Sequence, residues 1–155
     1  MAADIKRILW PTDLSNNALF ALPYVRSMSE KFQAEVHLLY VAEDVTWFDH
    51  FYGDADPKFL MELQDKIMKS AEEQLEKLCM NDLAGCPTFR RDIIVGNPVE
   101  EILRTIREAH MDLVIMATHG HGLKGTMTHF PFGSVTEKVT KSSPVPVLIV
   151  NPQTS

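Results

Sequence analysis

The chain has 155 residues, 45% of them hydrophobic and 23% charged, which is enough for one hydrophobic core and ordinary for a globular protein. Its formal net charge is −6 and no stretch is dense in lysine and arginine, which argues against a non-specific binder of nucleic acid or of an anionic membrane. No apolar run is long enough to span a bilayer, and no secretory leader precedes the first apolar segment. We therefore expect one cytoplasmic domain over residues 1–155.

Short apolar runs rich in β-branched residues alternate along the chain with longer stretches of helical period. The runs predict strands at residues 5–10, 36–41, 89–95, 113–117 and 147–150. The first helical stretch follows the turn-forming residues 11–15, and Pro23 interrupts its pattern. Its expected buried side chains are Ala18, Leu22, Val25 and Ser29.

Three further helices are expected. The second helix is long and carries a buried stripe of Leu60, Leu63, Ile67, Ala71, Leu75 and Leu78, after a loop at residues 42–57 that holds several aromatic side chains. A third begins at Asn97, because asparagine caps helices and Pro98 suits the first helical position. A fourth begins at Ser134.

Five strands that alternate with four helices predict βαβ units with right-handed crossovers, and hence a doubly wound parallel sheet. Ligands of such sheets bind beyond the carboxyl ends of the strands, where the strand order reverses. Two segments at strand ends stand out: Pro11-Thr12-Asp13, and residues 117–134 with four of the seven glycines. Glycines let backbone amides approach an anion, and a helix start favours phosphate. The alternative is a flexible connection whose glycines only serve turns.

Several segments resemble the universal stress proteins in order and spacing. They are ILWPTDLS at residues 8–15, LLYV at 38–41, GNPVEEIL at 96–103, DLVIMATHG at 112–120, GSVTEKV at 133–139 and PVPVLIV at 144–150. The resemblance covers nearly the whole chain. It implies an open five-stranded parallel sheet of strand order 3-2-1-4-5 with helices on both faces, and a homodimer paired through the C-terminal strand.

The resemblance also implies an adenine-nucleotide site, with ATP as the ligand and Mg²⁺ bound through its phosphates. In the nucleotide-binding branch of the family, the signature is Gly, two residues, Gly, nine residues, then Gly with Ser or Thr. Here Ala117 replaces the first Gly, and twelve residues rather than nine separate Gly120 from Gly133. The extra residues fall within 126–132, where they either close over the phosphates or move the amides out of reach.

The residues expected to bind the nucleotide come from the ends of three strands and the start of the last helix. By the resemblance, Asp13 recognises the nucleoside and Val41 brings backbone groups to the base edge, while the amides at the helix start hold phosphate. From the residues alone, the alternatives are an Asx-turn at Asp13, core packing at Val41 and a helix cap at Ser134. The full set is Pro11, Thr12, Asp13, Val41, Met116, Ala117, His119, Gly120, Gly133, Ser134 and Val135.

Catalysis is not expected, because no general base or water-positioning residue can be named; any ATP hydrolysis would be slow. His119, His121 and His129 share one loop but have no cysteine or acidic partner at metal-site spacing, so no metal-binding side chains are predicted. The resemblance predicts an ATP-binding protein of stress response or signalling. The alternative is a dimeric protein of the same fold that binds other proteins and no nucleotide.

Overall fold

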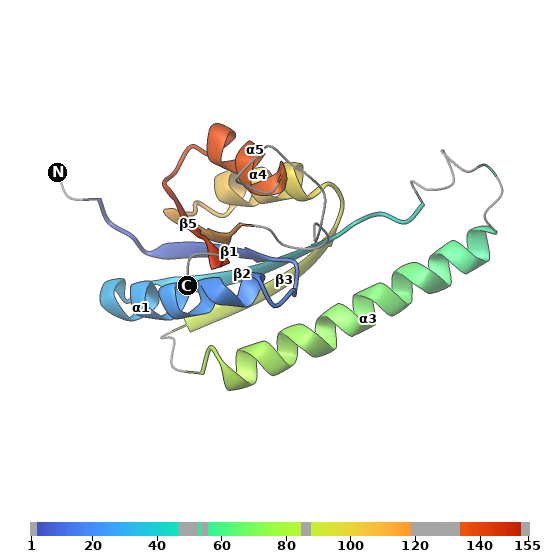
Figure 1. The fold of residues 1–155 in the computed structure, drawn as a ribbon, viewed down its shortest axis with the longest axis horizontal. Helices are drawn as coiled ribbons and strands as arrows, with labels where there is room; N and C mark the ends of the chain where they lie inside the picture. The colour runs from blue at the N-terminus through green and yellow to red at the C-terminus, as the bar shows by residue number, and fades with distance from the viewer. Residues whose placement is uncertain (1–2, 47–52, 54–55, 85–87, 119–133, 153–155) are drawn as a thin grey trace.

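The computed structural model describes residues 3–46, 53, 56–84, 88–118 and 134–152. All five predicted strands and all four predicted helices are present, within a few residues of their expected bounds (Figure 1). In chain order the elements are β1 (Arg7–Thr12), the 3-10 helix η1 (Ala18–Ala21), α1 (Leu22–Phe32), β2 (Glu35–Ala42), α3 (Pro57–Asn81), β3 (Thr88–Val95), α4 (Pro98–Glu108), β4 (Leu113–Ala117), α5 (Ser134–Ser142) and β5 (Val147–Val150).

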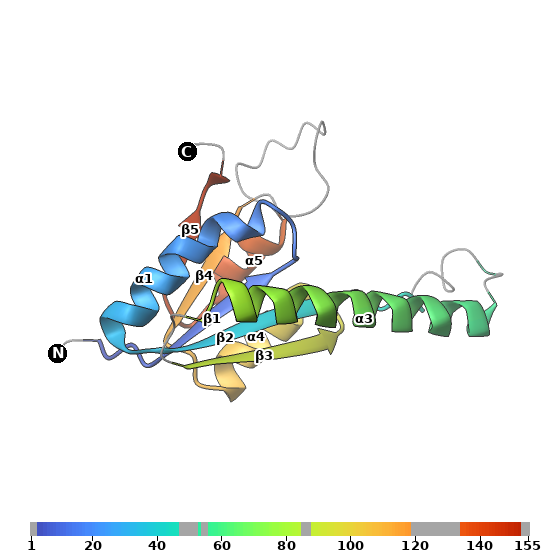
Figure 2. The same cartoon turned by 90° about the horizontal axis from the view of Figure 1, so that it is seen from below.

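The strands form one parallel sheet in the order β3-β2-β1-β4-β5, which confirms the predicted order. Helices α1 and α3 cover one face of this sheet and α4 and α5 cover the other (Figures 1 and 2). The doubly wound arrangement is therefore confirmed as well. Among the described helices, none is both long enough and apolar enough to cross a membrane.

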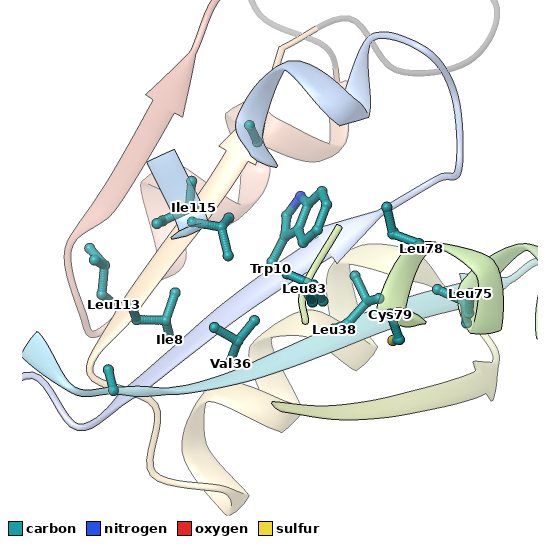
Figure 3. Packing of buried hydrophobic residues seen from close by; sticks show 13 residues of the cluster. Ile8, Trp10, Val36, Leu38, Leu75, Leu78, Cys79, Leu83, Leu113 and Ile115 are labelled. Atoms are coloured by element: carbon teal, nitrogen blue, oxygen red, sulfur yellow. The ribbon is translucent and has the colours of Figure 1, made fainter. Parts of the chain in front are cut away.

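The core has two layers, because successive side chains of a strand point to opposite faces of the sheet. On the face of α1 and α3, Ile8, Trp10 and Leu38 are buried together, with Trp10 in the middle of the cluster (Figure 3). On the face of α4 and α5, Leu9 and Val139 belong to the second cluster. The two faces are thus sealed by different helices.

Local signals account for the helix starts. Asn97 caps α4 as predicted, since its side-chain Oδ1 accepts a hydrogen bond from the backbone N–H of Glu100 at 3.2 Å. Pro23 does not break the first helix as its position suggested. It occupies the second position of α1, where the backbone N–H of any residue would lack a partner inside the helix.

Strand β1 runs beyond its predicted end. Residues Pro11 and Thr12 were expected to lie in a turn, but pairing with β2 continues to Thr12, which lies in register with Tyr40. Proline has no amide hydrogen, yet it is tolerated here because the neighbouring strand β4 is no longer in register with β1 at this level. The ligand-site turn therefore begins two residues later than the sequence pattern indicated.

Helix α3 is 25 residues long and projects beyond the sheet (Figures 1 and 2). Its contacts with the cluster on this face come from the C-terminal half, where Leu75 and Leu78 are buried, whereas Leu60 is buried near the N-terminal end outside that cluster. In the N-terminal half, Phe59 and Met61 are 59% and 67% exposed. The predicted stripe is buried at Leu60, Ala71, Leu75 and Leu78, and half-buried at Leu63 and Ile67.

This uneven docking predicts uneven sensitivity to mutation along α3. Leu75→Ala should lower the free energy of unfolding by about 2–5 kcal/mol, because it leaves a cavity in the core. Met61→Ala is the matched control on the same helix, and it should change that free energy by less than about 0.5 kcal/mol. Urea denaturation followed by circular dichroism measures both. Equal losses would contradict the difference in burial between Leu75 and Met61.

Candidate functional site

Strand order reverses between β1 and β4, the place where α/β sheets commonly bind ligands. Strands β1 and β4 are paired at Ile8 with Leu113 and at Leu9 with Val114. Both strands nevertheless continue, to Thr12 and Ala117. On its other side β1 stays in register with β2 as far as Thr12. At their carboxyl ends, β1 is therefore still paired with β2 but no longer paired with β4.

A side-chain network shapes the turn after β1. Thr12 Oγ1 accepts a hydrogen bond from the N–H of Leu14 at 3.1 Å, and Asp13 Oδ1 accepts one from Ser15 at 2.9 Å. Ser15 Oγ then accepts the N–H of Ala18 at 3.2 Å, where η1 begins. Leu14 has φ of 63°, a left-handed conformation that costs a non-glycine residue about 1–2 kcal/mol. The hydrogen bonds of its neighbours hold this strained turn, and the Asx-turn foreseen for Asp13 is present.

Negative charge gathers at this corner of the sheet. Tyr40 is half-buried near the end of β2, and burial raises the pKa of its phenol. The carboxylates of Asp13 and Glu43 raise the pKa of Tyr40 further, because a second negative charge nearby is unfavourable. The corner is therefore suited to groups that donate hydrogen bonds, such as hydroxyls and amines, and unsuited to anions.

The opposite electrostatic character is found at the start of α5. Its first residue, Ser134, is exposed, and Thr136 in the first turn donates from Oγ1 to the carbonyl of Ala117 at 3.3 Å. This bond fastens the helix start to the end of β4. Free amides and the helix dipole make such an end attractive to an anion. The last helix was expected to begin at Ser134, and α5 does begin there.

Thr118 follows β4 directly and was not foreseen as a site residue. Its side chain is fully buried, and in the described part of the chain its hydroxyl has no hydrogen-bond partner. Its backbone N–H donates to the carbonyl of Val150 at 2.9 Å, so its position is held. Buried hydroxyls are normally hydrogen-bonded, which marks Thr118 as a candidate ligand contact. The available sequence signal was a hydroxyl residue just after a buried strand.

The remaining predicted site residues either present mainly backbone groups to a ligand or lie outside the described part of the chain. Val41 is half-buried and packs against the core on the α4 face, and Met116 is 5% exposed, so both present mainly backbone groups. His119, Gly120 and Gly133 lie outside the described residues, as do the loop extension and the aromatic segment at residues 47–52. Among the described His, Cys, Asp and Glu side chains, no three are placed to hold a metal ion.

Comparisons with known proteins agree on one family. Residues 4–151 match the model of the Universal stress protein family. The chain is 33% identical over 166 residues to universal stress protein MJ0577 of Methanocaldococcus jannaschii, with all of both chains covered. The solved structure of MJ0577 is similar with a TM-score of 0.81 at 32% identity, covering 98% of this chain and 99% of that one.

Two more distant structures share the fold. A universal stress protein solved in complex with cAMP has a TM-score of 0.61 at 20% identity, covering 96% of this chain and 98% of its own. The universal stress protein of Archaeoglobus fulgidus in complex with dAMP has a TM-score of 0.61 at 14% identity, with the same coverage. At these identities the likeness establishes the architecture alone.

The negative corner predicts a coupled titration. Asp13→Asn should lower the pKa of Tyr40 toward its usual value of 10.0, because it removes one of the charges that raise it. The folded-state pKa of Tyr40 is raised, so its contribution to stability is present below pH 10.0 and lost as pH rises through the folded value. The ultraviolet absorbance of phenolate reports the titration, and Tyr40→Phe identifies the signal. An unchanged Tyr40 titration in Asp13→Asn would contradict the proximity of these two groups.

Proposed function

The chain belongs to the universal stress protein family, and from that premise we propose that it binds an adenine nucleotide, ATP, and acts in stress response or signalling with little or no catalysis. The observation that carries the proposal is that two regions of opposite electrostatic character lie at the carboxyl ends of the strands. The carboxylates of Asp13 and Glu43 lie near the end of β1 and β2, and the start of α5 lies at the end of β4. A nucleotide has the complementary order, with donor groups on its nucleoside and negative charge on its phosphates.

For the nucleoside end, the proposal assigns Asp13 as the acceptor for hydroxyl or amine donors. Its Oδ1 already accepts the amide of Ser15, which fixes the orientation of the carboxylate toward the ligand. Backbone groups of Pro11, Thr12 and Val41 would line the base. These backbones belong to hydrogen-bonded strands, so little conformational freedom is lost when the ligand binds.

For the phosphate end, the proposal assigns the amides at the start of α5, from Gly133 to Val135, together with the backbone of residues 116–120. The buried hydroxyl of Thr118 supports this assignment, because a phosphate oxygen would supply its partner. Nearby Glu137 already pairs with Lys141 at 2.7 Å. Mg²⁺ would therefore be held by phosphate oxygens and water rather than by carboxylates of the protein.

The cAMP and dAMP complexes lend support of a general kind. In those two proteins the same architecture holds an adenine nucleotide. The resemblance of residues 117–134 to the glycine signature of the nucleotide-binding branch is the feature that directs the proposal to ATP, and the longer spacing is a departure from that signature. Thr118 and Thr136 extend the site beyond the residues that the signature names.

The proposal includes a homodimer paired through β5. The sheet ends in β3 on one side and β5 on the other. Strand β3 carries Arg90, Arg91 and Asp92, whereas residues 142–152, which include β5, carry no charged side chain. Soluble proteins commonly protect a free sheet edge with charge, because unprotected edges pair with other chains. The β5 edge is thus the one suited to pairing with a second copy.

The role of Asp13 can be tested by two substitutions. Asp13→Ala should lower ATP affinity about 10–100-fold, equivalent to about 1–3 kcal/mol, because a charged hydrogen-bond acceptor is lost. Asp13→Asn keeps an oxygen that can accept the Ser15 amide, so it should preserve thermal stability while still weakening ATP binding. Isothermal titration calorimetry gives the affinities.

Asp112→Ala provides the matched control. Asp112 Oδ2 accepts hydrogen bonds from the backbone N–H groups of Lys6 and Arg7, each at 2.9 Å. These residues lie at the amino ends of the strands, away from the proposed site at the carboxyl ends. This change should lower stability and leave ATP affinity unaltered. If folded Asp13→Ala retained full affinity, Asp13 would serve only the turn. If the wild type bound no adenine nucleotide at millimolar concentration, the protein-binding alternative would replace the proposal.

A further inference from the structure

Large apolar side chains lie exposed along η1 and the first half of α1. Phe20 is 44% exposed, Tyr24 is 49% exposed, and Met28 is half-buried. They are spaced four residues apart, so they follow one side of the helical segment, here called the α1 stripe. Leu19, beside the stripe, is 38% exposed. A row of exposed apolar side chains on one side of a helix is a candidate contact surface for another molecule.

The direction of the α1 stripe follows from the handedness of the fold. In a right-handed β1-α1-β2 crossover seen with α1 in front and carboxyl ends upward, β2 lies to the right of β1 and β4 to the left. Helix α1 runs downward and buries Val25 and Ser29 against the sheet. Tyr24 comes one residue before Val25, and Met28 one residue before Ser29, which is a rotation of about 100° around the helix axis. This rotation directs Tyr24 and Met28 to the left, toward β4 and β5.

Other observations agree with this direction. Figure 2 shows α1 on the side of β4 and β5, with α3 on the side of β2 and β3. Helix η1 contacts both β4 and β5. Leu148 and Val150 of β5 pack on the same face of the sheet as α1, and both remain half-buried. The η1 end of the α1 stripe therefore lies next to the uncharged β5 edge, and the rest of the stripe faces the same side.

The size of a stable interface argues that strand pairing needs such a neighbour. Strand β5 has four residues and a length of about 13 Å. Stable interfaces bury about 800 Å² on each partner, more than a strand of this length supplies by itself. The exposed parts of Phe20 and Tyr24 add on the order of 200 Å², and they do so as aromatic groups, which are favoured at the centre of interfaces.

We propose that the α1 stripe is the second contact of a homodimer, packing across the two-fold axis onto Leu148 and Val150 of a second copy of this chain. Antiparallel pairing of β5 with its copy keeps the α1 faces of both copies on the same side of the joined sheet. The partner's β5 would then lie about 4.8 Å from β5, beneath the side to which Tyr24 and Met28 point. This inference rests on the β5 pairing included in the proposed function.

The test compares two double variants of the full chain. Phe20→Glu with Tyr24→Glu should raise the dimer dissociation constant at least tenfold, because two charges would be buried against apolar side chains. Phe59→Glu with Met61→Glu is the matched control, since it adds the same charges to apolar side chains that are more exposed and lie on α3. Analytical ultracentrifugation over a concentration series measures the constants, and circular dichroism verifies folding. Tyr24→Glu alone gives the same comparison should the double variant unfold.

The outcomes separate the two claims. A dimeric wild type that is weakened by the stripe variant and not by the control supports the proposal. A dimeric wild type whose two variants behave alike overturns the role of the α1 stripe and leaves β5 pairing in place. A wild type that stays monomeric at micromolar concentration overturns the homodimer itself. Nucleotide binding, measured on the same samples, is judged separately from all three.

Discussion

The central position of β1 is the constraint on which the rest of the structure depends. It pairs with β2 on one side and β4 on the other, and chain order reverses across it. Its register with β2 reaches Thr12, whereas its recorded register with β4 stops at Leu9. The turn at Asp13 is consequently placed beside the end of β4 without being joined to it by the ladder. In the proposed function, that separation lets the turn at Asp13 and the start of α5 contact one ligand.

The candidate site gains its polarity from this placement. Asp13 follows β1 and lies near Tyr40 and Glu43, so negative charge collects at one end. The start of α5 is bound to Ala117 through Thr136, which puts positive helix-dipole character at the other. Leu14, next to Asp13, has a strained left-handed backbone, a pattern more common where function requires a particular backbone. This arrangement is the basis for proposing a ligand that has hydrogen-bond donors at one end and negative charge at the other.

Much of the fold was predictable because its signals are local. Asn97 caps α4 by a contact within four residues, and β4 and β5 have the bounds that their apolar runs indicated. Tyr40 and Thr118 were missed because their roles depend on strand register and burial, which one sequence does not contain. The end of β1 was misjudged for the same reason, since pairing with β2 outweighs the tendency of Pro11 to end a strand. The residues of the glycine loop keep only their predicted roles.

The most direct test of nucleotide binding is native mass spectrometry of the freshly purified wild-type protein, with and without added ATP and Mg²⁺. The account predicts an adenine nucleotide bound to the folded chain, either co-purified or acquired from added ATP, in a ratio of one per chain. A nucleotide-free mass that persists with millimolar ATP would contradict it. In that case the acidic corner and the start of α5 would have to be explained by a ligand of another class.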